Sequence, residues 1–221
     1  MIDLQQAMLE RHSVRSYTDR PLDGEVLDQI RAYIDQLNAR SGLHLQLVLN
    51  EPEAFGGMLA HYGRFSGVTS YLALVGLDGP CLEEDCGYFG EKFVLYAQRL
   101  GLNSCWVGGT FKKVPSAFSL AEGEKLCLVI ALGYGQTQGR PHRGKPISRL
   151  SRTRDMPEWF VRGVEAAALA PTALNQQKFS FELTGDKVLA RAGIGPFSKV
   201  DLGIAKLHFE LGSGRDSSVW L

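Results

Sequence analysis

The sequence predicts a protein of mixed helices and strands, built from one unit and a shortened second copy of that unit. Apolar residues recur at helical spacing in some segments, and in others they alternate or run together as they do in strands. Similar features follow one another in the same order in the two parts of the chain, which indicates an internal duplication. The glycine-rich turn at residues 133–139 does not match the Rossmann fingerprint, so we exclude a dinucleotide-binding fold of that kind.

Length and charge bound the class of protein. The chain has 221 residues and a formal net charge of +0, because 24 Lys and Arg residues balance 24 Asp and Glu residues. That length allows one large domain or two small ones, and the balanced charge argues against a nucleic-acid partner. No apolar run is long enough to span a bilayer, and the first residues lack the pattern of a signal peptide. We therefore expect a cytoplasmic protein without a membrane partner.

Cysteine and histidine spacing predicts neither a disulfide framework nor a metal site. Cys81, Cys86, Cys105 and Cys127 form no CxxC pair and are few for the chain length, so we expect reduced thiols. No two of the five histidines stand at a helical metal-ligand spacing, so we expect no bound metal.

The first part of the chain opens with two helices and a strand. Apolar residues at helical spacing predict a helix at residues 4–11 and another at residues 26–37, the second preceded by a capping Asp23 and ended near Gly42. Residues 44–49 alternate between apolar and polar side chains, which predicts a strand.

A weakly patterned segment separates these elements from the next strand and helix. Residues 54–61 suggest a short helix, and we expect the surrounding glycine-containing segment, residues 56–67, to form a lid. The apolar run at residues 71–75 predicts a central strand. A long helix is expected at residues 85–100, ended by Gly101.

Two strands with glycine-rich ends follow. The apolar stretch at residues 102–110 contains Gly108 and Gly109, and paired glycines permit either close approach of the backbone to a flat ligand or an ordinary tight turn. Residues 126–132 predict a buried strand. The turn after it is one residue too long for GxGxxG and leads into a basic connector, residues 140–154, rather than into a helix. That connector is either a solvated linker or a phosphate clamp.

In the second part, a predicted helix changes within a few residues to an irregular polar segment and then to a predicted strand. A helix predicted from residue 158 ends at the Ala170-Pro171 step, because proline lacks a backbone donor and restricts the residue before it. Asn175 and Gln177 follow in an irregular segment, before an alternating strand at residues 178–183. The segment is either a polar loop capped by Thr172 or a site for a planar heterocycle, whose edge suits side-chain amides.

The duplication is visible in matched positions. The helix and strand at residues 26–37 and 44–49 correspond to those at residues 158–169 and 178–183. Three residues of the long helix recur in register near the C-terminus: Asp85, Gly87 and Phe93 match Asp201, Gly203 and Phe209. We therefore divide the chain into a complete unit, residues 1–154, and a truncated half-unit, residues 155–221.

An arginine motif occurs only in the first unit. Arg11 and Arg15, with Ser13 between them, stand at the end of a helix and could hold a phosphate through charge-assisted hydrogen bonds, each contributing roughly 1.5–3 kcal/mol. The alternative is a pair of surface arginines favoured by the helix dipole. Because the amide cluster lies in the second unit, a ligand that needs both would bind between the two units.

Three segments together resemble the signature regions of the FMN-dependent nitroreductase superfamily. They are residues 11–17 (RHSVRSY), 100–109 (LGLNSCWVGG) and 170–177 (APTALNQQ). In ordinary members the Pro-to-Gln motif closely follows the arginine motif, whereas here it lies near the C-terminus. This order resembles a nitroreductase subfamily in which one chain imitates the usual homodimer. Lys178 stands where many members have proline.

The resemblance implies an α+β fold with a central, mainly antiparallel sheet flanked by helices, and FMN bound between the two halves. By position, the residues implied for the phosphate and ribityl chain are Arg11, His12, Ser13 and Arg15, with Arg143 and Lys145 nearby. Those implied beside the flavin are Pro171, Thr172, Asn175 and Gln177 from the second half, and the backbone of Gly108 and Gly109 near the redox-active nitrogen.

The implied reaction has two steps. NAD(P)H reduces FMN and leaves, after which an electron-poor small molecule such as a nitroaromatic or quinone accepts the electrons by ping-pong kinetics. No catalytic side-chain acid or base is required, because the flavin performs the hydride chemistry. The attached second half implies a monomer with one FMN. Two alternatives stay open: another reaction on the same FMN-binding fold, or a flavin-binding or sensing protein without turnover.

Overall fold

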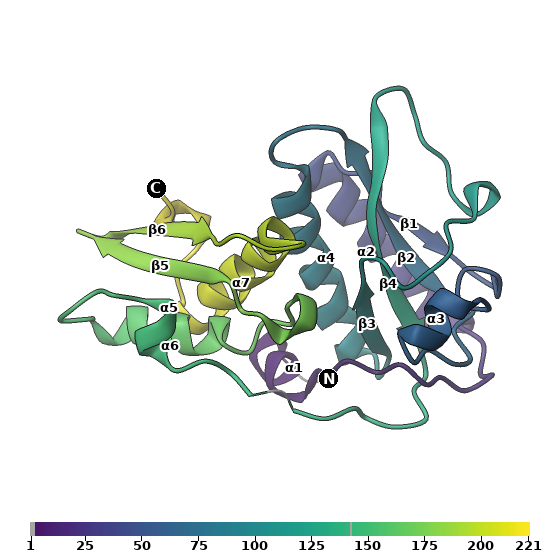
Figure 1. Ribbon diagram of the computed structural model, residues 1–221, viewed down its shortest axis with the longest axis horizontal. Coiled ribbons are helices and arrows are strands. Elements are labelled where there is room, and N and C mark those ends of the chain that lie inside the picture. The colour runs from purple at the N-terminus through teal and green to yellow at the C-terminus, as the bar shows by residue number, and fades with distance from the viewer. Residues whose placement is uncertain (1–2, 142) are drawn as a thin grey trace.

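A four-stranded antiparallel sheet forms one side of the molecule (Figure 1). The computed structural model describes residues 3–141 and 143–221. The strands, in their order across the sheet, are β1 (Gln46–Val48), β2 (Tyr71–Leu77), β4 (Glu124–Gly133) and β3 (Asn103–Val107). Each neighbouring pair is antiparallel, so the exclusion of a parallel dinucleotide-binding sheet is confirmed for this part of the chain.

Both faces of this sheet are buried, because its central strands carry apolar side chains at successive positions. In β2, Leu72 and Leu74 join the core beneath the long helices, whereas Tyr71, Ala73 and Val75 join a second core on the opposite face. Successive side chains of a strand point to opposite faces, so a continuous apolar run predicts a strand covered on both sides.

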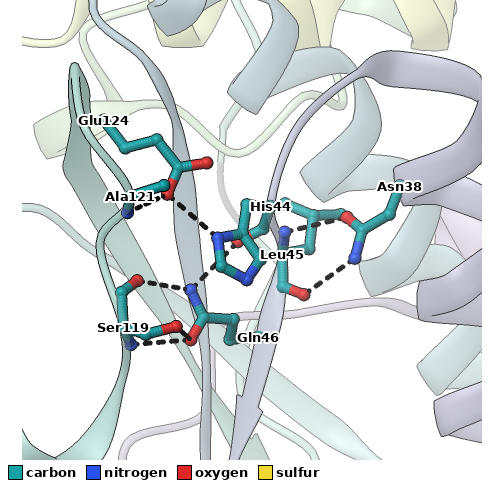
Figure 2. A network of polar contacts seen from close by, with 7 residues as sticks. All are labelled: Asn38, His44, Leu45, Gln46, Ser119, Ala121 and Glu124. Carbon is teal, nitrogen blue, oxygen red and sulfur yellow. Dashed lines mark hydrogen bonds and ion pairs between the residues drawn. The ribbon is translucent and has the colours of Figure 1, made fainter.

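Helices flank the sheet and carry the chain to a second layer. The helices of the first part are α1 (Leu4–Glu10), α2 (Gly24–Ser41), α3 (Met58–Tyr62) and α4 (Leu82–Arg99), with a 3₁₀ turn, η1 (Pro115–Ala117). Asp23 occupies the N-cap of α2 but makes no side-chain capping hydrogen bond. At the other end of α2, the amide of Asn38 pairs with both backbone groups of Leu45 (2.8 and 3.0 Å), which fixes the entry into β1 (Figure 2).

The second part packs against α4 (Figure 1). The short helix α5 (Ile147–Leu150) lies in the connector that leads to it, and its own elements are α6 (Glu158–Ala167), the 3₁₀ turn η2 (Ala173–Asn175), β5 (Phe179–Thr184), β6 (Lys187–Ala192), α7 (Ser198–Ser213) and the 3₁₀ turn η3 (Ser217–Val219). Strands β5 and β6 form an antiparallel hairpin, and α7 lies between α4 and α6. The fold is therefore α+β, with a mainly antiparallel sheet flanked by helices, as predicted.

Helices α4 and α7 approach each other in a reciprocal way. A Cβ atom at Gly87 would collide with the backbone carbonyl of Val200, and one at Gly203 would collide with the carbonyl of Glu84. Each carbonyl belongs to the residue three positions before the partner glycine, so exchanging the two helices exchanges the two contacts. This geometry is consistent with the predicted duplication, whose matched positions include these two glycines.

Several element boundaries differ from the predicted ones. The helix expected at residues 54–61 lies at 58–62, the strand expected at 44–49 is shortened to 46–48, and α6 ends at Ala167 in a turn before Pro171. None of the helices in the described residues combines the length and apolar character that crossing a bilayer requires.

Candidate functional site

A cavity of about 580 Å³ lies between the two parts of the chain. The first part contributes Ser13, Arg15 and residues 62–65 and 105–110. The second part contributes residues 171–174 and the start of α7, with Pro196, Phe197, Val200, Asp201 and Ile204. The volume is typical of sites for small molecules and cofactors. Six of the residues predicted from the sequence line it: Ser13, Arg15, Gly108, Gly109, Pro171 and Thr172.

The arginine motif runs as an extended segment beside β3. The backbone N–H of Val14 donates to the carbonyl of Ser104 (3.0 Å), and the N–H of Ser66 donates to the carbonyl of Arg15 (2.9 Å). Alternate side chains of an extended segment point in opposite directions. Ser13 and Arg15 therefore face the cavity, whereas Val14 is buried in the core.

The paired glycines follow β3, and a close contact explains the first of them. A Cβ atom at Gly108 would overlap the aromatic ring of Phe197, which comes from the second part of the chain. Gly109 has no such neighbour. The two parts can thus meet at this point because residue 108 has no side chain.

Strained backbone gathers at the cavity. In the described residues, seven non-glycine residues have positive φ, and Arg64 (60°), Leu174 (53°) and Phe197 (58°) among them line the cavity. Asn175 and Gln177 belong to the same set and lie within three residues of Leu174. Non-glycine residues in this region cost of order 1–3 kcal/mol each and tend to cluster at functional sites. Their distribution therefore supports a binding role for this cavity.

The amides predicted to face a ligand bind backbone instead. Gln177 is buried; its Oε1 accepts from the N–H of Lys145 (2.6 Å) and its Nε2 donates to the carbonyl of Ala168 (2.9 Å). The Nδ2 group of Asn175 donates to the carbonyl of Arg143 (3.2 Å). Neither residue lines the cavity. These amides fix the 171–177 loop to the connector and to the end of α6.

The remaining predicted residues lie beside this loop or beside the arginine motif. Nζ of Lys145 donates to the carbonyls of Gln176 (2.7 Å) and Gln177 (3.0 Å), so this cation also holds the loop. Thr172 accepts the N–H of Gln177 on its Oγ1 (3.1 Å) rather than capping the turn that follows it. His12 lies against Gly139, at the end of the glycine-rich turn at residues 133–139, outside the cavity lining.

Three titratable groups line the cavity besides the arginines: Tyr62, Cys105 and Asp201. Asp201, at the start of α7, accepts from the N–H of Ala173 (2.9 Å) and from Nε2 of Gln176 (2.8 Å). Burial raises its pKa from 3.8 to about 6, partly opposed by these two hydrogen bonds. Burial also raises the pKa of the Cys105 thiol, which therefore stays protonated at neutral pH. Sequence reasoning missed Asp201, although its register with Asp85 marked it.

Arg11 is buried next to the cavity rather than in its lining. Only 3% of the residue is exposed, and its Nε lies 3.9 Å from Oε1 of Glu91. Nε and Nη1 have no hydrogen-bond partner. Glu91 also binds Trp106 and His208. Sequence reasoning missed Glu91 and His208, since neither belongs to a recognisable motif.

Exposed apolar side chains surround the mouth of the cavity. Tyr62 is 86% exposed and Leu174 is 93% exposed, and both line the cavity from opposite parts of the chain. Met58 and Leu59, on the same short helix as Tyr62, are also exposed. Exposed apolar patches of this kind mark ligand grooves or interaction sites.

The chain is an α+β protein with a cavity between its two parts, and comparison with known families is more specific. Residues 3–213 match the family described as "Putative TM nitroreductase". Since the match spans nearly the whole chain, the protein belongs to this nitroreductase family. No curated protein sequence matches the chain significantly.

Solved structures show the same fold. A protein described as a nitroreductase from Thermotoga maritima MSB8 has a TM-score of 0.68 and 24% identity, covering 96% of this chain and 83% of that one. A nitroreductase in complex with FMN from Desulfovibrio desulfuricans has a TM-score of 0.55 and 18% identity, covering 71% of this chain and 99% of that one. A nitroreductase family protein from Streptococcus pneumoniae has a TM-score of 0.54 and 15% identity, covering 69% and 100%.

Proposed function

We propose that the chain binds FMN in the cavity between its two parts and passes electrons from NAD(P)H to an electron-poor acceptor such as a nitroaromatic or quinone. The observation that carries this proposal is the meeting of Ser13 and Arg15 with the Gly108-Gly109 turn and the 171–174 loop around one cavity. Family membership supports the oxidoreductase class, and the Desulfovibrio relative in complex with FMN supports the cofactor.

The residues present fit FMN on two independent grounds. The buried guanidinium of Arg11 has unpartnered N–H groups, and a buried donor without a partner is costly unless a ligand or water satisfies it. An anionic phosphate would be such a ligand. The cavity beside it has polar and cationic groups at Ser13 and Arg15 and aromatic walls at Phe65 and Phe197, as a ligand with a charged tail and a flat ring requires.

The roles of the chain's own residues follow from their positions. Arg11, Ser13 and Arg15 would hold the phosphate and ribityl chain of FMN. The backbone of Gly108 and Gly109 would approach the flavin ring closely. Asp201 and Lys145 hold the 171–177 loop in place. When bound, FMN supplies the capacity to accept and donate hydride, so no side-chain acid or base is needed. The apolar rim at Tyr62 and Leu174 favours a flat, apolar acceptor.

Cofactor binding and turnover test the proposal separately. We expect the purified chain to bind FMN with quenching of flavin fluorescence, and to oxidise NADH or NADPH steadily when a quinone is added. Initial rates at varied concentrations of both substrates should give the parallel lines of ping-pong kinetics; intersecting lines would contradict that step. Tight FMN binding without turnover would instead favour a flavin-binding or sensing protein, and failure to bind FMN would overturn the whole proposal.

Two substitutions test whether the two parts share the site. Arg11→Ala in the first part and Asn175→Ala in the second should each weaken FMN binding, because one removes a cation and the other releases the loop from the connector. Arg31→Ala, at an exposed position on α2, is the control. FMN affinity unchanged by either test substitution would remove that residue from the site.

We also propose that the units at residues 1–154 and 155–221 replace the two subunits of a homodimer, so that the chain is a monomer with one FMN. The reciprocal contacts of Gly87 and Gly203 support this. Size-exclusion chromatography with light scattering should give the mass of one chain, and titration should give one FMN per chain. An obligate dimer with two sites would contradict the proposal.

A further inference from the structure

A buried acid and a buried histidine join the two parts of the chain beside the cavity. Glu91 on α4 and His208 on α7 are both 0% exposed, and Nε2 of His208 lies 2.9 Å from Oε1 of Glu91. Nδ1 of His208 lies 3.2 Å from the carbonyl oxygen of Ala166 on α6. The other carboxylate oxygen of Glu91 accepts from Nε1 of Trp106 (2.9 Å), a residue that lines the cavity.

The hydrogen-bond partners of this pair occupy the carboxylate that lies nearest to Arg11. Both ring nitrogens of His208 have partners, the carbonyl of Ala166 and Oε1 of Glu91, and both carboxylate oxygens of Glu91 are contacted, one by His208 and the other by Trp106. Nε and Nη1 of Arg11 make no hydrogen bond, and no carboxylate other than that of Glu91 pairs with Arg11 among the described residues.

His208 also explains why Arg11 is only loosely paired. Nε of Arg11 lies 3.9 Å from the same Oε1 atom that His208 contacts at 2.9 Å, and it makes no hydrogen bond there. A carboxylate without the histidine would form a close, charge-assisted pair with the guanidinium. By occupying Oε1, His208 leaves the cation available to an anion.

We infer that His208 is a positioning residue: by binding Oε1 of Glu91 it keeps this carboxylate from pairing closely with Arg11, so that Arg11 keeps its donors for a phosphate group and Trp106 stays fixed at the cavity wall. This inference rests on the proposed function for the identity of the cofactor. On this inference, a residue of the second part of the chain, His208, determines whether Arg11 of the first part is available to bind phosphate.

The test compares three replacements by titration with FMN. In H208F the carboxylate of Glu91 is free to pair with Arg11, so the dissociation constant of FMN should rise about tenfold or more. In H208Q the amide can donate from near the position of Nε2, so affinity should stay within about threefold of wild type. In the double variant H208F/E91Q the competing carboxylate is absent, so affinity should return to within about threefold of wild type.

A second histidine–glutamate pair provides the matched control. Nδ1 of His44 lies 3.0 Å from Oε2 of Glu124, in a polar network outside the cavity lining (Figure 2). H44F should leave the dissociation constant of FMN unchanged. The inference is overturned if H208F binds FMN as tightly as wild type, if H208Q loses as much affinity as H208F, or if H208F/E91Q binds no better than H208F. A purely structural role would make the double variant the weakest of all.

Inorganic phosphate gives a readout that does not depend on FMN. Phosphate should raise the melting temperature of the FMN-free wild type above its value in chloride at equal ionic strength, because it binds the folded state. That rise should be lost in H208F and restored in H208F/E91Q; an equal rise in all three proteins would overturn the inference. If the wild type binds phosphate but not FMN, the proposed function fails while the inference stands. Should H208F not fold, H208M takes its place, since methionine adapts to irregular core spaces.

Discussion

Replacing Asp201 by asparagine should remove a pH-dependent loss of stability from the loop that closes the cavity. Burial raises the pKa of this carboxyl group from 3.8 to about 6 in the folded chain, while its hydrogen bonds from Ala173 and Gln176 offset part of that effect. The folded state thus holds the proton more tightly than the unfolded state. The contribution of the Asp201 carboxyl group to the free energy of unfolding is therefore fully present below pH 3.8, and it is lost as the pH rises through about 6. A difference of about two pKa units corresponds to ~3 kcal/mol.

Urea unfolding of wild type and Asp201→Asn at pH 4 and pH 7 measures this effect. The difference in free energy of unfolding between the two proteins should shift by about 2–3 kcal/mol in favour of the variant between these pH values, because other titrating groups cancel in the comparison. Asp28→Asn, at an exposed position on α2, is the control and should show no such shift. An equal difference at both pH values would refute the reasoning for Asp201.

Two further predictions concern the packing of the two parts and the cation in the cavity. Gly87→Ala and Gly203→Ala should each lower the free energy of unfolding by about 1–3 kcal/mol, since the added methyl group meets a backbone carbonyl. Gly79→Ala is the control and should change this free energy little, because a methyl group there meets nothing within 4 Å. Equal effects at all three positions in chemical unfolding would contradict the close helix contact. Arg15→Ala should raise the dissociation constant of FMN about tenfold or more, measured by flavin fluorescence against the Arg31→Ala control, and an unchanged constant would exclude a contact between Arg15 and the cofactor.

Structural features that are specified by residues adjacent in sequence were predicted well. The apolar runs of β2 and β4 indicated buried central strands, and both lie in the middle of the sheet. The Ala170-Pro171 step indicated the end of α6, although the last turn loosens from Ala168 onward. These outcomes follow because helix termination and strand burial are specified by residues adjacent in sequence.

The exact partners of polar side chains were not predictable in the same way. Gln177 was expected to face a heterocycle, but its amide binds the backbone of Lys145 and Ala168. An amide offers the same donors and acceptors to a ligand as to a backbone group, so sequence alone cannot distinguish the two. Glu91 and His208 show the same limit more strongly, since their pairing exists only because α4 packs against α7.

The two parts of the chain contribute differently to the cavity between them. In the described residues the β5–β6 hairpin forms a sheet of its own, and no further strands extend it as β4 and β3 extend the first sheet. The first part supplies the Gly108-Gly109 turn, which follows β3, and the second part supplies Thr172, Leu174 and the ring of Phe197. If the second part is a truncated copy of the first, as we propose, it completes this site without such a turn of its own, which is why we expect one FMN per chain.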